Sequence, residues 1–216
     1  MKTRLLFQAG ISAVLLCGCA SQHLTLQRNK DIIHRYFEEW GNHGDTNAAD
    51  ELIAGPRKGV KGPFIPLLRS PRLLAPLQKA GEYLRFDSAL PRRVSEFATL
   101  LVARQWMQQF EWFVHVPLAR QEGTSVGTIE ALRIGRRPPT MSAEEAFVYD
   151  FILELTTHRG VSDAMYGECI ERFGERGVID LVGLIGYFAL VSMVLNVAHT
   201  PPHEVEGVVR LPTLPL

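Results

Sequence analysis

The feature that most constrains the fold is a run of eighteen residues without a charge, 181–198. Its length meets the minimum for a membrane-spanning helix. Gly183, Gly186, Ser192 and Asn196 interrupt its apolar surface, however, and no Lys or Arg anchors either end. A helix that is apolar on every side also suits the buried centre of a protein or of an oligomer. We therefore expect a buried helix, covered in part by association of several copies of the chain.

Helix signals recur through the rest of the chain, and no segment shows the alternation of apolar and polar residues that is typical of a strand. Ser142 and Glu145, for example, form a capping box at the start of one expected helix. We predict an all-α protein with a helical domain over 56–200. A short helical appendage over 19–55 precedes this domain, and a tail over 201–216 follows it.

The beginning of the chain has a different character. Lys2 and Arg4 precede an apolar run that ends at Cys19, and this pattern resembles the lipobox of a bacterial lipoprotein. The resemblance implies a signal peptide over 1–18, a lipid on Cys19, and an exported protein anchored to the periplasmic face of the outer membrane. An ordinary secretory signal, which would give a periplasmic protein, is the alternative.

Composition argues against nucleic-acid binding and against dithiol chemistry. The chain has 23 basic and 23 acidic residues, so charge gives no reason to expect binding to nucleic acid. Of its 3 cysteines, Cys17 would leave with the signal peptide and Cys19 would carry the lipid. Cys169 would then be a single thiol, and the mature chain would form no internal disulfide or dithiol.

An acid and an imidazole stand four residues apart in the apolar and aromatic stretch 109–119, at Glu111 and His115. On a helix these positions share one face. A buried carboxylate or imidazole needs a partner, because its desolvation is otherwise uncompensated. The pair is either a structural contact at the edge of the core or an acid–base couple that lines a pocket.

A longer pattern includes this pair. Glu96, Gln108, Glu111 and His115 have the spacing E-x11-Q-x2-E-x3-H. It resembles the signature of alkylhydroperoxidase D, E-x11-C-x-x-C-x3-H, with Gln and Glu in place of the two cysteines. The spacing of Glu111 and His115 also resembles that of carboxymuconolactone decarboxylases, and the flanking sequence extends the likeness over about residues 60–200.

The resemblance implies an all-α oligomer, a trimer or a hexamer, that needs no metal or organic cofactor. Peroxidase chemistry of this type requires a thiolate and a second, resolving thiol. Gln108 and Glu111 supply neither, so an alkylhydroperoxidase-type antioxidant is the disfavoured alternative. Lyase chemistry requires only an acid, a base and stabilisation of developing charge. His115 and Glu111 can supply the proton transfers, with Glu96 in support.

Glu96 presents a geometric difficulty, because nineteen residues of one straight helix would place it about 28 Å from His115. The family resemblance implies a break near Met107–Gln109, although no glycine or proline marks one. Arg104 is expected to bind a substrate carboxylate if it faces inward; otherwise it would be solvated or paired with Glu. Gln108 is assigned to substrate binding with it.

The expected function is therefore that of a lipid-anchored acid–base lyase that acts on a small carboxylated or lactone substrate. A non-catalytic, membrane-tethered binding protein is the other alternative, because catabolism of aromatic compounds is normally cytoplasmic. Residues 29–54 weakly resemble the opening helices of SnoaL-like polyketide cyclases, but the curved sheet of those proteins is not expected to follow.

Overall fold

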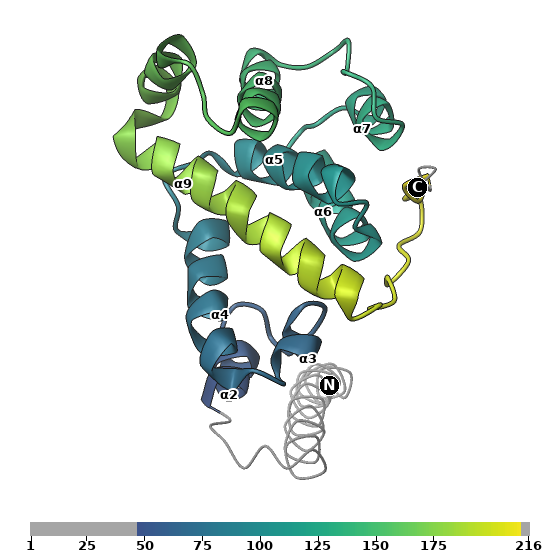
Figure 1. Cartoon of the computed structure of the whole chain (residues 1–216). Helices are drawn as coiled ribbons and strands as arrows, with labels where there is room; N and C mark the ends of the chain where they lie inside the picture. The colour runs from purple at the N-terminus through teal and green to yellow at the C-terminus, as the bar shows by residue number, and fades with distance from the viewer. Residues whose placement is uncertain (1–46, 213–216) are drawn as a thin grey trace, which may run out of the picture. The chain divides into compact units, whose positions relative to one another are not determined.

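A computed structural model describes residues 47–212, and within that range the protein is built from helices without a strand, as the sequence predicted (Figure 1). The helices are α2 (Asn47–Ala54), α3 (Phe64–Leu67), α4 (Pro71–Phe86), α5 (Arg92–Gln105), α6 (Gln109–Gln121), α7 (Val126–Arg133), α8 (Ala143–His158) and α9 (Asp163–Val197). The expected signal peptide, Cys19 and most of the expected appendage lie outside the described residues.

The chain divides into two compact units between Gln78 and Lys79, within α4. In the first unit, the Gln78 amide donates to a Glu51 carboxylate oxygen over 2.6 Å and so ties α4 to α2. The Arg57 guanidinium lies 4.8 Å from the centre of the Phe64 ring, which joins the connecting loop to α3. The candidate site belongs to the second unit.

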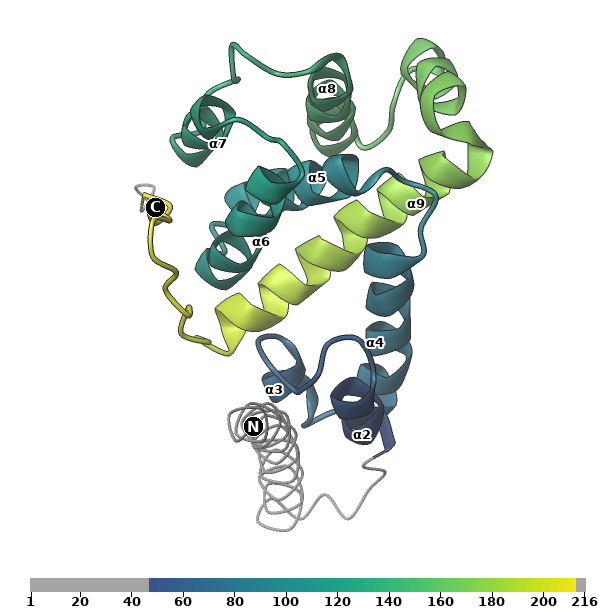
Figure 2. The same ribbon diagram turned by 180° about the vertical axis from the view of Figure 1, so that it is seen from behind.

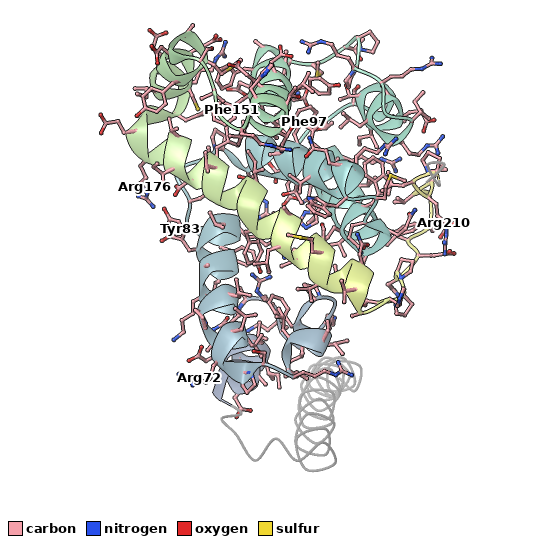
Figure 3. All side chains as sticks on the ribbon, viewed as in Figure 1. Arg72, Tyr83, Phe97, Phe151, Arg176 and Arg210 are labelled. Carbon is pink, nitrogen blue, oxygen red and sulfur yellow. The ribbon has the colours of Figure 1, made fainter. Side chains whose placement is uncertain are left out.

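Helix α5 forms the centre of the second unit and packs against α6, α7, α8 and α9 (Figures 1 and 2). Every residue from Val94 to Arg104 is buried, because neighbouring helices cover α5 on all sides. Phe97 of α5 and Phe151 of α8 are among the largest fully buried side chains of the described residues (Figure 3). Polar residues on such a helix must find partners inside the protein.

The capping box predicted at the start of α8 is present. Ser142 Oγ accepts from the Glu145 amide over 3.2 Å, and Glu145 Oε2 accepts from the Ser142 amide over 2.8 Å. Buried Glu145 also accepts from the Thr124 hydroxyl over 2.8 Å. The cap therefore fixes both the start of α8 and its attachment to the loop after α6.

The charge-free run lies in α9, which bends at Gly174, where φ is 72° and ψ is 170°. Helix α9 is the one described helix that is long and apolar enough to cross a bilayer, but 56% of its apolar window is buried in the structure. One side of the charge-free run packs into the hydrophobic core, and the other side exposes Val182, Met193 and Val197.

The segment after α9 runs back along α6 and α7. Trp112 Nε1 donates to the Val209 carbonyl over 3.0 Å, and the Gln109 side chain exchanges two hydrogen bonds with the backbone of Leu211. Buried Trp112 and half-buried Gln109 of α6 thus hold the tail near Val209 and Leu211 in place.

Candidate functional site

The site depends on the break between α5 and α6. Met107 adopts a left-handed backbone conformation with φ 53°. Its amide donates to the Arg104 carbonyl over 3.2 Å, and the Gln108 amide donates to the Ala103 carbonyl over 2.8 Å. This pair of bonds is a Schellman motif, which usually has glycine where Met107 stands. The chain therefore ends α5 and turns without the residue that normally reveals such an end in a sequence.

Gln108 starts the next helix at the same turn. Its Oε1 accepts from the Phe110 amide over 2.5 Å, and its Nε2 donates to Asn196 Oδ1 of α9 over 2.9 Å. Asn196 in turn donates to the Trp106 carbonyl over 2.9 Å. Both the oxygen and the nitrogen of the Gln108 carboxamide are thus hydrogen-bonded within the protein. Through Asn196, these bonds hold the turn between α5 and α6 against α9.

The turn brings together the three residues that the sequence pattern singled out. His115 Nδ1 lies 2.5 Å from Glu96 Oε2, across the interface between α6 and α5. On the other edge of the ring, His115 Nε2 lies 3.3 Å from Glu111 Oε2, one turn earlier on α6. One imidazole therefore stands between two carboxylates from two helices.

The cluster lies inside the protein. Glu96, Glu111 and His115 expose 6%, 4% and 2% of their surfaces. The Phe188 ring of α9 meets the His115 ring edge to face, with 5.0 Å between the ring centres. This apolar contact and the contact with Glu96 leave the imidazole little freedom to rotate, so its two nitrogens keep their assigned partners.

Burial and hydrogen bonding oppose each other at His115. Burial disfavours the charged ring, but hydrogen bonds to Glu111 and Glu96, together with the charge of Glu96, outweigh it and raise the pKa of His115 above its usual 6.5. For Glu96, burial acts to raise the pKa, but the hydrogen bond and the charge of His115 outweigh that effect and lower it below the usual 4.5. The two carboxylates therefore favour the charged form of the ring, and that charge in turn favours the ionised form of Glu96.

This arrangement suits proton transfer. Glu96 orients the ring through Nδ1, and Nε2 faces Glu111, the second group that can hold the same proton. An imidazole with a carboxylate on each edge can hold a proton and release it with little movement of heavy atoms. The geometry therefore provides an acid–base couple with a fixed orientation.

Arg104 faces inward, which is the condition that its predicted role required. It is 9% exposed, but its Nη1 donates to Met107 Sδ over 2.7 Å, and its Nη2 lies against Gly135. Along α5, eight residues separate it from Glu96, a rise of about 12 Å. Arg104 thus lies at the end of α5, about two turns beyond Glu96.

Two residues near the cluster were not predicted. Arg85, at the end of α4, carries a positive charge near the cluster. This charge favours the ionised form of Glu96 and the neutral form of His115, so it acts to lower both pKa values; for His115 the carboxylates outweigh it. Phe188 covers the ring of His115 from the middle of the charge-free run. No sequence signal singles out either residue, because an arginine in a last helical turn and an aromatic in an apolar run are both common.

Comparison with known proteins gives no family for the chain: no protein-family model matches it, and neither does any curated protein.

Proposed function

We propose that this protein is an acid–base enzyme in which His115, held between Glu96 and Glu111, transfers a proton to or from a substrate. The observation that carries the proposal is the placement of one oriented imidazole between two buried carboxylates, at 2.5 Å and 3.3 Å. In this proposal Glu96 orients the ring and stabilises its charged form. Glu111 takes or returns the proton at Nε2.

The reaction class that fits these groups is lyase chemistry of the carboxymuconolactone decarboxylase type, on a small carboxylated or lactone substrate. The proposal rests on the resemblance of the Glu96–Gln108–Glu111–His115 spacing to that family, and the all-helical structure is consistent with it. Arg104 is proposed to bind the substrate carboxylate. Gln108, whose amide is engaged with Phe110 and Asn196, would contribute by holding α6 in place.

The thiol-dependent alternative finds little support. Cys169 is the one cysteine within residues 47–212, and it is buried. Burial raises the pKa of the Cys169 thiol to about 11, so it carries almost no thiolate at neutral pH. Peroxide reduction at this residue would lack both an activated nucleophile and a resolving partner.

Location and assembly complete the proposal. A lipid on Cys19 would tether the enzyme to the periplasmic face of the outer membrane, and the exposed apolar side of α9 would be covered by other copies of the chain. Changing Cys19 to Ser would then abolish lipid labelling and release the protein from the membrane fraction. Retention of Met1 and recovery of the wild type in the soluble cytoplasm would contradict this location.

A panel of lactones and keto acids, with wild type and His115→Gln compared on the same preparations, tests the function. General acid–base groups contribute about a hundredfold to ten-thousandfold in rate, and His115→Gln should lose that factor while remaining folded. His158→Gln, which changes an exposed histidine at the end of α8, is the matched control and should keep full turnover. Unaltered turnover in folded His115→Gln would rule out the assignment, and binding without turnover in the wild type would favour a binding protein.

A further inference from the structure

A buried arginine outside the acid–base cluster lacks an anionic partner. Arg104 is 9% exposed, and its Nε is buried without a hydrogen-bond partner. The one hydrogen bond found for its guanidinium is to Met107 Sδ, a weak and neutral acceptor. None of the ion pairs found among residues 47–212 includes Arg104.

This is an unusual state for a cation in a protein interior. Buried charges are normally paired, because desolvation is otherwise uncompensated. Arg93, on the same helix, shows the usual solution: its Nη2 lies 3.4 Å from Glu145 Oε2, a buried carboxylate. Arg104 is more deeply buried than Arg93, which is 35% exposed at its side chain, and yet has no carboxylate.

A second cation increases the need for an anion at this place. Burial lowers the pKa of Arg104, and the nearby charge of Arg133 lowers it further. Arg133 makes two hydrogen bonds of 2.7 Å to Glu130, and its Nη1 donates to the Arg210 carbonyl over 3.1 Å. Glu130 thus neutralises Arg133 on the outer side of α7, whereas Arg104 on the inner side keeps its charge uncompensated.

The loop after α7 packs closely against Arg104. Gly135 adopts φ 73° and is exposed, and a Cβ atom added there would stand 2.7 Å from Arg104 Nη2. The absence of a side chain at Gly135 therefore leaves Nη2 unobstructed at this contact. Nη2 and the unpartnered Nε lie on one edge of the guanidinium, the edge that matches the two oxygens of a carboxylate.

We propose that Arg104, with Arg133 and Gly135 beside it, forms a binding site for a small carboxylate anion. A planar carboxylate would satisfy Nε and Nη2 together and neutralise the buried charge. The inference rests on the role proposed above for Arg104 and gives that role a defined site, but the site can exist without proton transfer at His115, so the two proposals can fail separately.

Thermal melting of the full-length protein in sodium acetate, compared with sodium chloride at equal ionic strength, tests the site. Acetate should raise the melting temperature of the wild type, because a ligand that binds only the folded state stabilises it. Arg104→Gln should abolish the rise, and Arg136→Gln, on the exposed part of the same loop, should keep it. His115→Gln should also keep it, which separates this site from the acid–base cluster.

A pair of glycine variants keeps the test decisive if Arg104→Gln fails to fold. Gly135→Ala places a Cβ against Arg104 Nη2 and should weaken acetate binding at least tenfold. Gly123→Ala imposes similar backbone strain, at φ 95°, but its Cβ meets nothing within 4 Å, so acetate binding should be unchanged. An equal acetate response in Arg104→Gln, unchanged affinity in Gly135→Ala, or a response to inorganic phosphate but not to acetate would overturn the proposal.

Discussion

Two buried acidic clusters in the second unit differ in the kind of partner that each carboxylate has. Asp180 of α9 accepts from the Tyr83 hydroxyl over 2.8 Å and 3.0 Å, and from the Ala89 amide over 2.7 Å. Glu96 and Glu111 share the single imidazole of His115. The first cluster ties α4, the turn before α5 and α9 together, and the second joins α5 to α6.

The difference lies in the groups that face the carboxylates. Asp180 accepts from a phenol and a backbone amide, whereas Glu96 and Glu111 stand on either side of an imidazole. Arg176, whose Nε donates to the Tyr83 hydroxyl over 3.0 Å, adds a charge at the exposed side (Figure 3). An imidazole between two carboxylates can gain or lose its proton near neutral pH. We infer that the Asp180 cluster is structural and that the His115 cluster is suited to chemistry.

The largest expected contrast concerns turnover. Glu111→Gln keeps the shape of the side chain but removes its charge, so turnover should fall about a hundredfold and its pH profile should move. Asp180→Asn, the matched change in the other cluster, should leave turnover per folded molecule unchanged. Steady-state rates of both variants across pH would measure the contrast. Equal losses in the two variants would show that the distinction between the clusters is wrong.

Stability should show the reverse contrast. Asp180→Ala removes a buried acceptor from the half-buried Tyr83 hydroxyl and from the amide of exposed Ala89, and the free energy of unfolding should fall by about 2 kcal/mol. Urea denaturation at constant pH would measure it. A loss below about 0.5 kcal/mol would mean that these donors find other partners, because surface changes commonly have effects of that size.

The pH dependence of stability should come from the His115 cluster. Because the folded-state pKa of His115 is raised, its contribution is fully present below pH 6.5 and is lost as pH rises through the folded pKa. Because the pKa of Glu96 is lowered, its contribution is present above pH 4.5 and is lost as pH falls through its folded value. Between pH 6.5 and the folded pKa of His115, the unfolding free energy should fall by up to about 1.4 kcal/mol per pH unit.

Urea denaturation at a series of pH values would record this alkaline decline. His115→Gln should flatten it, and His158→Gln should leave it as it is in the wild type. A decline of the same slope in His115→Gln would assign the effect to another group.

The smallest effect is expected at the exposed edge of the Asp180 cluster. Arg176 is 62% exposed at its side chain and lies 3.7 Å from Asp180 Oδ2. Exposed ion pairs contribute little, because solvent screens them. Arg176→Ala should therefore lower the melting temperature only slightly, far less than Asp180→Ala does. Calorimetry would measure both melting temperatures. If Arg176→Ala lowered the melting temperature as much as Asp180→Ala, then Arg176, and not Tyr83 and the Ala89 amide, would stabilise the Asp180 carboxylate.

Local sequence signals predicted much of the helical structure. The capping box at Ser142 and Glu145 lies where the sequence placed it, at the start of α8. This feature was predictable because it depends on contacts within a few residues of the chain. The bend of α9 at Gly174 has no comparable signal, since Gly167, Gly174 and Gly177 could each end a helix.

The geometry of the site depended on features that a sequence does not display. Met107 takes the left-handed conformation without being glycine, so the break between α5 and α6 had no local signal. Asn196 supports that break from 88 residues away through Gln108. The spacing of Glu96 and His115 suggested a site, but only the turn between their helices reduces their separation from the length of a helix to a hydrogen bond.

The most direct test of the account is the titration of the His115 ring by NMR, with His115→Gln used to assign its signals. Because hydrogen bonds to Glu111 and Glu96 favour the charged ring, His115 should keep its proton above pH 6.5, and Glu111→Gln should shift its titration to lower pH. Titration of His115 at or below pH 6.5 in the wild type, unmoved by Glu111→Gln, would contradict the claim that the two carboxylates hold its proton.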